Sequence, residues 1–386
     1  MTGSGFNKKY DVAVVGSGPA GAMAAFCLAK KGVRVAVLEK SALPRYKPCG
    51  GGIVRKAMQF LPVDVSELIE RECYQVELNF ILHHIHFSAK RKQPIVSMTM
   101  RDKFDYSLVS AARAAGAAIF SKCRVVDVVS TVDTIELMTS KGPFHTRFVV
   151  GTDGVLSTVA KKSGWQESRN LIPAIETEII VSKEEMDRFC HSARFDFGLF
   201  SAGYGWVFPK KAHLSVGVLS MRKNRVRLND MMENYLNALG LDSSKRSKRY
   251  GYLIPVTPRN DAFMKGSVLL AGDAAGFANP ITGEGISFAL LSGQIAADAL
   301  LDGAFQKSRV KNIFESEIKK KILSELHLAH IFAKLIYRYP RLFRFLFRFH
   351  GQKFVENVTD IEMGKTTYCC LASDPLNYVK LLQLWN

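Results

Sequence analysis

The sequence of 386 residues lacks the cysteine and histidine spacings of a metal site, because its seven cysteines form no CxxC pair. It also lacks the charged and then apolar start of a secretory signal, since strand-forming residues begin at Tyr10. We therefore expect no metal and a reduced, cytoplasmic setting. No apolar run reaches the roughly 18 residues of a spanning helix. The nearest, residues 285–301, is interrupted by Gln294 and Asp298, so any membrane contact is expected to be peripheral.

Acidic residues are scarce, with 35 Asp and Glu against 53 Lys and Arg, a formal net charge of +18. Such a surplus predicts an anionic partner, which could be nucleic acid, anionic lipid or a phosphorylated substrate. Half of the surplus lies in residues 304–353, which contain twelve Lys and Arg and three Glu. The apolar content of 47% excludes a disordered chain.

Residues 10–39 have the order strand, tight turn, Ala-rich helix and strand, which predicts one βαβ unit. Residues 74–100 and 170–220 carry Val, Ile, Phe and Thr in broken alternation, as in a mostly antiparallel sheet. A helical pattern begins at Arg101 and continues to Ala115, and another covers residues 305–350 with a break at Pro340. The chain has no internal repeat and no low-complexity linker, so the two kinds of sheet are expected to interleave.

The βαβ unit contains Gly16-x-Gly18-x-x-Gly21 between strand and helix, and Glu39 ends its second strand. Gly16 allows the tight turn, Gly18 lets the backbone approach a pyrophosphate, and Gly21 lets helix and strand pack closely. Glu39 is placed to accept hydrogen bonds from ribose hydroxyls. The context predicts a dinucleotide site, but it does not choose between NAD and FAD.

Three later segments resemble the flavoprotein family of aromatic hydroxylases, halogenases and geranylgeranyl reductases. They are Arg101-Asp-Lys-Phe-Asp-Tyr106, Gly151-Thr-Asp-Gly-Val-Leu-Ser157, and Gly272-Asp273 followed by Asn279-Pro-Ile-Thr-Gly283-Glu-Gly285-Ile286. The resemblance implies that Asp273 binds the ribityl chain of FAD and that residues 283–286 offer backbone amides to the flavin. A helix N-terminus suits the flavin edge that becomes negative on reduction.

Two further motifs are similar to those of the geranylgeranyl reductases. Residues 43–52 resemble their cysteine-glycine loop, which lies against the isoalloxazine, and residues 204–210 match their YxWxFPK motif. The resemblance implies an FAD site formed by Gly16, Gly18, Ala20, Gly21, Glu39, Cys49, Gly50, Gly52, Arg101, Val125, Asp273, Gly283, Gly285 and Ile286. It implies a substrate site formed by Tyr204, Trp206, Phe208, Pro209 and Lys210, with Cys49, Tyr204 and Trp206 as catalytic candidates.

The predicted fold is α/β, with a Rossmann-like FAD-binding domain interleaved with an antiparallel-sheet substrate domain and followed by C-terminal helices. The expected domains are residues 1–73, 101–165 and 251–304 for FAD, residues 74–100 and 166–250 for the substrate, and residues 305–386 for the basic helical region.

Several of these residues also have a simpler interpretation. Alternating large side chains such as Tyr204, Trp206 and Phe208 usually form one packed face of a strand, although a wall for a prenyl chain is also natural here. Cys49 is either a small packed side chain or a redox-capable thiol, with Cys369 or Cys370 as possible partners. The alternating His83, His84 and His86 are expected on a solvated strand face.

The first functional hypothesis is an FAD-dependent reductase that saturates carbon-carbon double bonds of a prenyl chain on a lipid, quinone, pigment or diphosphate. Its electron donor would be NAD(P)H or ferredoxin, and its proton donor Tyr204, Tyr46 or an ordered water. A second hypothesis keeps the fold and proposes an NAD(P)H-dependent monooxygenase. A third, a basic FAD-containing protein acting on nucleic acid, has only the charge in its favour.

Residues 341–349 predict a short helix with Arg341, Arg344 and Arg348 on one side and Leu342, Leu346 and Phe349 on another. This pattern favours a helix at an anionic membrane surface, on the inner face of the membrane. A helix packing its phenylalanines onto the protein's own core is the alternative.

Overall fold

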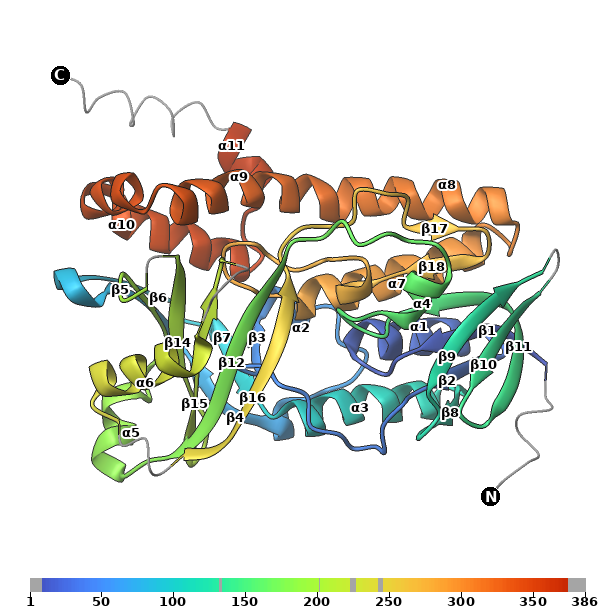
Figure 1. Ribbon diagram of the computed structural model, residues 1–386, viewed down its shortest axis with the longest axis horizontal. Coiled ribbons are helices and arrows are strands. Elements are labelled where there is room, and N and C mark those ends of the chain that lie inside the picture. Colours follow the sequence, from blue (N-terminus) through green and yellow to red (C-terminus); the bar gives the residue numbers. More distant parts are fainter. Residues whose placement is uncertain (1–8, 132–133, 201, 223–226, 242–245, 374–386) are drawn as a thin grey trace.

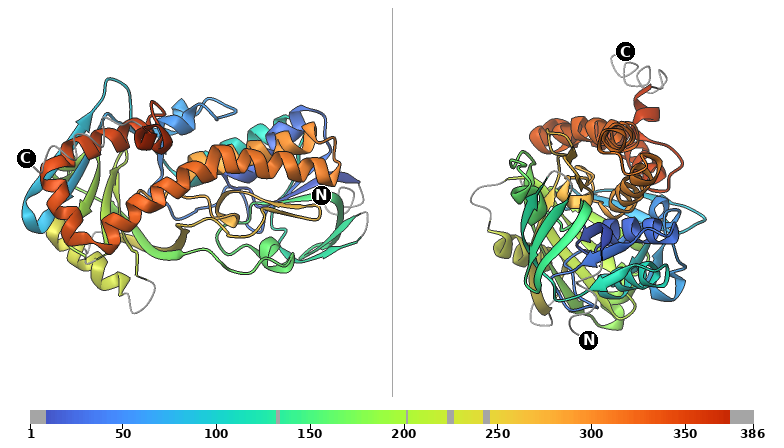
Figure 2. Two further views of the ribbon diagram at one scale, coloured as in Figure 1. Left: turned by 90° about the horizontal axis from the view of Figure 1, so that it is seen from above. Right: turned by 90° about the vertical axis from the view of Figure 1, so that its right-hand side faces the viewer.

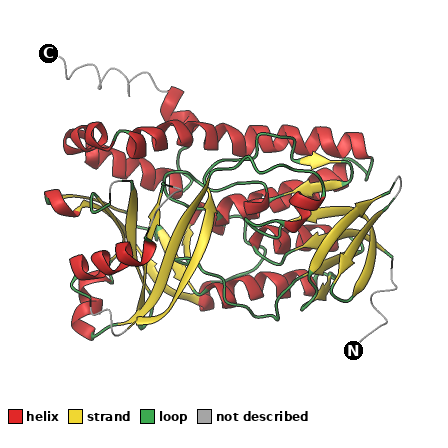
Figure 3. Ribbon diagram, in the orientation of Figure 1, coloured by secondary structure: helices red, strands yellow, loops and turns green. Residues whose placement is uncertain are grey.

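The computed structural model describes residues 9–131, 134–200, 202–222, 227–241 and 246–373. Figure 1 shows an elongated molecule with a sheet near each end and a row of C-terminal helices along one side. The view from above in Figure 2 shows that this row follows the long axis. In Figure 3 the two groups of strands are joined by the helices and loops of the middle. The predicted α/β fold with C-terminal helices is confirmed.

The first sheet is built on the predicted βαβ unit. β1 (Tyr10–Val15) and β2 (Val35–Leu38) pair in parallel, with Val12 opposite Val35 and Val15 opposite Leu38. The Ala-rich helix α1 (Pro19–Lys30) connects them and packs against α7 (Ile286–Asp302). From Val12 to Val15 and from Val35 to Leu38 the two strands are apolar and buried, because helices cover both faces of the sheet there.

Strands from distant parts of the chain complete this eight-stranded sheet in the order β17-β18-β11-β1-β2-β8, with the β9–β10 hairpin paired to β11. β18, β11, β1 and β2 run parallel, so the turns after β1, β11 and β18 meet at one edge. The added strands are β8 (Ala118–Phe120), β9 (Val125–Ser130), β10 (Ile135–Thr139), β11 (Gly142–Gly151), β17 (Met264–Lys265) and β18 (Val268–Leu270).

The second sheet has seven strands in the order β16-β12-β15-β14-β13-β5-β6, and in the described chain only the β13–β5 pair is parallel. One face is covered by α5 (Lys183–Phe189) and α6 (Leu228–Leu239). The strands are β5 (Gln75–Phe80), β6 (Ile85–Lys90), β12 (Leu171–Ile180), β13 (Ser192–Phe197), β14 (Gly203–Pro209), β15 (His213–Ser220) and β16 (Arg246–Pro255).

The domain boundary expected between residues 250 and 251 falls inside β16. This strand stays paired with β12 as far as Pro255, which lies opposite Leu171. The second sheet therefore extends five residues beyond the expected boundary.

A three-stranded sheet between the two larger ones combines segments that were expected in different domains. β7 (Val96–Thr99) pairs with both β3 (Gly52–Val54) and β4 (Ile69–Cys73). It is followed by α3 (Arg101–Ala114), while α2 (Arg55–Met58) follows β3 and α4 (Thr158–Lys162) follows β11.

The C-terminal region forms α8 (Lys307–Ile318), a π-helical turn at Lys319–Leu323, α9 (Ser324–Arg338), α10 (Pro340–Glu362) and α11 (Tyr368–Ser373). Pro340 ends one helix and begins the next, as the sequence predicts, because proline suits a first helical turn. The expected short helix at 341–349 is the first part of the longer α10.

The three histidines do not alternate on one strand. His83 ends a 3-10 turn, His84 has the left-handed φ of 50°, and only His86 lies on β6. Among the described residues, no three His, Cys, Asp or Glu side chains gather as metal ligands. None of the helices in the described part of the chain is both long and apolar enough to span a membrane.

Candidate functional site

The glycine turn after β1 leaves no room for side chains where the backbone is crowded. Gly16 has a φ of +99°, and a Cβ there would lie 2.5 Å from the Thr152 carbonyl oxygen. A Cβ at Gly21 would lie 2.0 Å from the Gly16 carbonyl oxygen, so this glycine permits the close packing of α1. Gly18 precedes α1 without a side-chain cap in the described structure. The free N–H groups of the helix therefore face an open turn, as an anion site requires.

Glu39 lies beside this turn and is held in its charged form. Its carboxylate accepts hydrogen bonds from the Ser17 backbone N–H (3.0 Å), the Ser17 hydroxyl (2.6 Å) and the Ser41 N–H (2.9 Å), and Arg45 is 3.5 Å away. Burial raises the pKa of Glu39, but these donors and the arginine outweigh burial and lower it. A carboxylate of this kind can accept hydrogen bonds from ribose hydroxyls.

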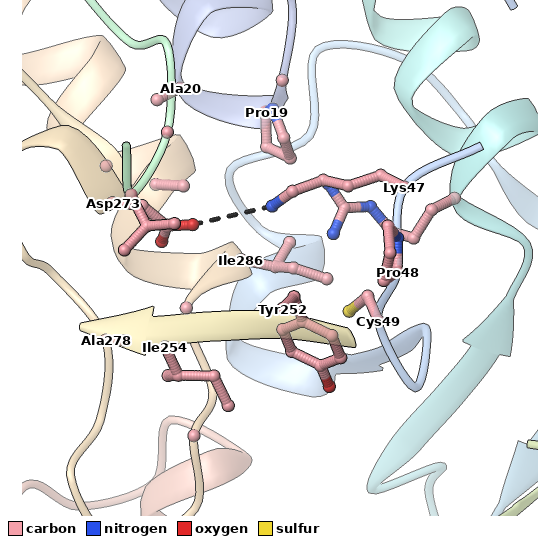
Figure 4. Close-up of a pocket in the computed structure, with 18 of the residues that line it drawn as sticks. Pro19, Ala20, Lys47, Pro48, Cys49, Tyr252, Ile254, Asp273, Ala278 and Ile286 are labelled. Atoms are coloured by element: carbon pink, nitrogen blue, oxygen red, sulfur yellow. Dashed lines mark ion pairs between the residues drawn. The ribbon is translucent and has the colours of Figure 1, made fainter. Parts of the chain in front are cut away.

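The loop of residues 43–52 leads from β2 of the first sheet to β3 of the three-stranded sheet and carries two cations over the site. Arg45 Nη1 lies 3.1 Å from Asp105 Oδ2, and Lys47 Nζ lies 3.6 Å from Asp273 Oδ2. Figure 4 shows the second pair bridging the pocket above Cys49. Asp273 belongs to the turn after β18, so the ion pair joins two edges of the site.

Cys49 lies at the end of this loop between charged groups from β12 and α3. Its N–H donates to Glu176 Oε1 of β12 at 2.7 Å. The buried Arg101 at the start of α3 forms a bidentate pair with Asp105. Burial opposes the charge of Arg101, but Asp105 and the Cys49 side chain raise its pKa. All seven cysteines are free thiols in the described chain, so neither Cys369 nor Cys370 is bonded to Cys49.

Tyr204, Trp206 and Phe208 alternate along β14 and form one wall of the cavity. The Trp206 ring occupies the space over Gly217 on β15, where a Cβ would lie 2.0 Å from the indole. The Phe208 ring similarly lies over Gly50, at 2.5 Å from a Cβ built there. Both interpretations of the motif are therefore partly right, since the side chains are buried and packed yet also line the cavity.

Pro209 and Lys210 stand outside the set of described residues that line the cavity. The buried Lys210 ammonium instead donates to the carbonyl oxygens of Gly50 (2.7 Å) and Thr99 (3.0 Å). The structure thus differs from the expectation of a substrate contact, because a buried ammonium needs oxygen partners and finds them behind the wall. Lys210 acts as a support for the Cys49 loop.

The turn before α7 is attached to the C-terminal helices. Tyr337 of α9 donates its hydroxyl to the Ile281 carbonyl oxygen at 2.8 Å, and Asn279 donates its amide to the Tyr368 hydroxyl at 3.1 Å. Gly285 precedes α7, and the Glu284 carboxylate accepts the Ser287 N–H of the first helical turn at 2.7 Å. That N–H group is therefore already satisfied, while residues 283–286 themselves line the cavity.

One cavity of about 680 Å³ connects all these elements, which is within the ~300–1,000 Å³ typical of ligand sites. Of the predicted FAD residues, Gly21 lies behind the turn. The others line the cavity: Gly16, Gly18, Ala20, Glu39, Cys49, Gly50, Gly52, Arg101, Val125, Asp273, Gly283, Gly285 and Ile286. The aromatic wall lines the same cavity, so a dinucleotide and an apolar substrate can meet in it.

Comparisons with known proteins agree with this geometry. A family model described as FAD binding domain matches residues 9–293. Digeranylgeranylglycerophospholipid reductase 2 of Methanococcoides burtonii is 30% identical over 321 residues, covering 76% of each chain. The chain belongs to the geranylgeranyl reductase family. The chloroplastic geranylgeranyl diphosphate reductase of Oryza sativa subsp. japonica is 29% identical over 341 residues, covering 81% of this chain and 70% of that protein.

A solved structure of a geranylgeranyl bacteriochlorophyll reductase-like protein from Thermoplasma acidophilum has the same fold. It superposes with a TM-score of 0.77 at 21% identity and covers 97% of this chain and 99% of that one. As a member of this family the chain is an FAD-dependent oxidoreductase, and the uncapped turn before α1, the ionised Glu39 and the open side of Asp273 fit the cofactor.

The sequence analysis missed three side chains of this reductase. Glu176 contacts the Cys49 loop from behind, Tyr252 of β16 faces Cys49 in Figure 4, and Glu362 of α10 reaches the cavity from the C-terminal helices. Of the three, only Glu176 could have been noticed in the sequence, because it is a charged residue within an otherwise apolar strand.

Proposed function

We propose that this protein saturates carbon-carbon double bonds of a prenyl chain carried by a lipid or diphosphate. Named relatives support the substrate class, because they include reductases of geranylgeranyl diphosphate and of digeranylgeranylglycerophospholipid. The observation that carries the proposal is the single cavity, which runs from the dinucleotide turn past Cys49 to the aromatic wall.

FAD, when bound and reduced, supplies a hydride to the alkene. Tyr204, Trp206 and Phe208 present apolar ring faces that hold the alkene and exclude water from it. Lys210 holds the loop that carries Cys49 through the Gly50 carbonyl. The chain therefore provides orientation and a dry environment, which the reduction of an isolated double bond requires.

The test is an anaerobic single turnover. The protein is reduced with dithionite, mixed with geranylgeranyl diphosphate or a digeranylgeranyl lipid, and followed by flavin absorbance and by mass spectrometry of the lipid. Reoxidation of the flavin together with products heavier by two hydrogens per bond supports the proposal. Reduced flavin that reacts only with oxygen, with hydroxylation of an added aromatic substrate, favours the monooxygenase instead.

We further propose that the first half of α10 rests on an anionic membrane surface. Phe343 and Phe347 are buried against Phe80 of the second sheet. The next stripe of the helix exposes Leu342 (48%), Phe345 (61%) and Phe349 (61%), and the basic stripe of Arg341, Arg344 and Arg348 lies beside it. Exposed phenylalanines next to arginines suit an interface of lipid headgroups and acyl chains. Such docking would keep the enzyme beside a lipid substrate.

A further inference from the structure

Glu176 is a fully buried carboxylate that is hydrogen-bonded to the loop of residues 43–52, which lines the cavity. On β12 its neighbours Ile175 and Ile179 face α6, so Glu176 and Glu178 face the opposite side, toward the loop. Glu176 Oε1 accepts the Cys49 N–H at 2.7 Å and the Tyr46 hydroxyl at 3.1 Å. Within the described residues, Oε2 is buried without a hydrogen-bond partner.

The groups around Glu176 favour its neutral form. Burial and the like charge of Glu178 raise its pKa to about 7, although the donors on Cys49 and Tyr46 and the cation of Lys210 oppose the shift. Other titratable groups on this face are Tyr250 and Tyr252 on β16, Lys248, whose Nζ lies 5.6 Å from the centre of the Tyr250 ring, and His213 on β15, whose Nε2 lies 3.0 Å from Glu178 Oε2. The carboxyl can therefore gain and lose a proton near neutral pH.

Among the described residues, Tyr46 is the side chain that joins Glu176 to the cavity by a hydrogen bond. The residue is 36% exposed, its ring centre lies 4.4 Å from that of Tyr250 with the two planes tilted by 34°, and it lines the cavity with Cys49. Burial and the two glutamates raise the pKa of the Tyr46 phenol, so it remains protonated and acts as a donor. When Glu176 is ionised, Tyr46 donates to it. When Glu176 carries a proton, it can donate to the Tyr46 oxygen and release the phenol proton toward the cavity.

We propose that Glu176 stores the proton of the alkene reduction and delivers it through Tyr46. This inference rests on the proposed function. Reduced FAD, when bound, would supply a hydride, with its electron pair, to one alkene carbon. The other carbon forms its C–H bond with the Tyr46 proton as the O–H bond breaks. Tyr46 regains a proton from Glu176, which becomes a carboxylate.

Because the Glu176 side chain has no contact with solvent, its proton returns from water through Tyr46 after the product leaves. A stored proton is useful because an apolar substrate in the cavity displaces water from the reacting carbons. Glu176 is thus a positioning and proton-storing residue, while Tyr46 is the group that touches the substrate.

The first experiment measures single-turnover flavin reoxidation by the prenyl substrate between pH 5 and 9. The wild-type rate should be highest below pH 7 and fall above it, because the protonated Glu176 is the active form. Glu176→Gln keeps an oxygen for the Cys49 N–H but stores no proton. Its rate should be roughly 10²-fold lower, which is the loss expected when a general acid is removed, and this rate should no longer fall above pH 7. Tyr46→Phe should lose as much, and the double variant no more.

The matched control is Glu178→Gln, which keeps the acid and removes its neighbouring charge. Its maximal rate should stay near that of wild type, while the decrease in rate should begin at a lower pH because the charge that raises the pKa of Glu176 is gone. Flavin reduction by dithionite and FAD affinity should be the same in all variants. A Glu176→Gln variant that is slow but keeps the wild-type fall above pH 7 would make Glu176 a purely structural support, and the proposal would be overturned.

A second measurement does not depend on turnover. The infrared signal of a protonated carboxyl, taken as wild type minus Glu176→Gln, should be present at pH 5 and disappear near pH 7. Absence of this signal at pH 5 overturns the stored proton even if the enzyme reduces prenyl chains. If the infrared signal titrates but no prenyl substrate reoxidises the flavin, the proposed function is wrong. The delivery of the Glu176 proton to an alkene is then wrong as well. If Glu176→Gln does not fold, Tyr46→Phe is tested instead. The proposal holds if this variant loses both the fall in rate above pH 7 and the solvent isotope effect of wild type, and it is overturned if both remain.

Discussion

Lys47 Nζ lies 3.6 Å from Asp273 Oδ2, so the loop after β2 and the turn after β18 are joined directly across the cavity (Figure 4). The Asp273 side chain keeps an open side, since it also lines the cavity. The FAD site is therefore held together partly by residues that are themselves expected to bind the cofactor.

We expect Glu39→Ala and Asp273→Ala to lose FAD. Each variant removes a carboxylate placed to accept hydrogen bonds from hydroxyl groups of the cofactor. The loss should be roughly 1.5–3 kcal/mol for each, or about ten- to a hundredfold in affinity. Fluorescence titration of the apoprotein with FAD measures it, with Asp302→Ala at the far end of α7 as the control. Unchanged affinity in both variants would refute the assignment.

Cys49→Ser should retain FAD and change turnover. The backbone N–H of residue 49 keeps its bond to Glu176, so the loop stays in place while the thiol beside Arg101 is lost. We expect a change of about tenfold in kcat, equivalent to about 1.4 kcal/mol. Steady-state assays with Cys190→Ser as the control give the answer. Kinetics equal to wild type would reduce Cys49 to a packing role.

Trp206→Ala should slow prenyl reduction more than flavin reduction by the electron donor, because the indole contacts the substrate side of the cavity. Removing this buried ring should also cost about 3–5 kcal/mol of unfolding free energy. Gly217→Ala is a useful companion, since its Cβ would displace the indole without deleting it. The two half-reactions are measured separately by stopped flow. Equal losses in both would contradict a substrate role.

The buried Glu176 makes stability depend on pH. Its folded pKa of about 7 lies above the ordinary glutamate pKa of 4.5, so the folded state binds the proton more tightly than the unfolded state. Its contribution is therefore favourable at low pH and is lost as the pH rises through about 7. Relative to Glu176→Gln, wild type should lose about 3 kcal/mol between pH 4.5 and 8. Urea unfolding at both pH values tests this, with the exposed Glu67→Gln as the control. A difference that stays constant with pH would be inconsistent with the raised pKa.

The membrane proposal predicts salt-sensitive binding to anionic vesicles. Arg341→Glu/Arg344→Glu/Arg348→Glu should weaken co-sedimentation, since each arginine contributes roughly 1 kcal/mol near an anionic leaflet. Phe345→Ser/Phe349→Ser should weaken it at high salt as well, because it removes exposed apolar area. Lys31→Glu/Lys92→Glu/Lys161→Glu changes the charge equally at exposed sites outside α10. If the arginine variant sediments as well as wild type, this helix is not a membrane anchor.

Local signals in the sequence predicted the parts of the fold that depend on local chemistry. Gly16 is required by its own positive φ of +99°, Gly21 by its close approach to the Gly16 carbonyl five residues earlier, and Pro340 fixes a helix start by its own ring. The alternation of Tyr204, Trp206 and Phe208 likewise predicted a strand face, although only pairing with β15 shows that Gly217 makes room for the indole.

The parts that sequence could not predict depend on long-range contacts. Lys210 looked like the end of a substrate motif, but its partners Gly50 and Thr99 are more than a hundred residues away. The contact between Glu176 and Cys49 spans 127 residues. In α10, periodicity alone could not decide which phenylalanines would be buried, because Phe80 on the second sheet selects Phe343 and Phe347.

The hydrogen bonds from Tyr337 to the Ile281 carbonyl and from Asn279 to Tyr368 have a practical consequence for redesign. A protein truncated before α9 would lose Tyr337 and Tyr368. The Asn279 amide and the Ile281 carbonyl oxygen, in the turn before α7, would then lack these hydrogen-bond partners. The C-terminal helices therefore cannot be exchanged independently of the turn that they contact. A chimera that takes them from a relative would need to bring the matching turn, residues 279–285, from the same parent.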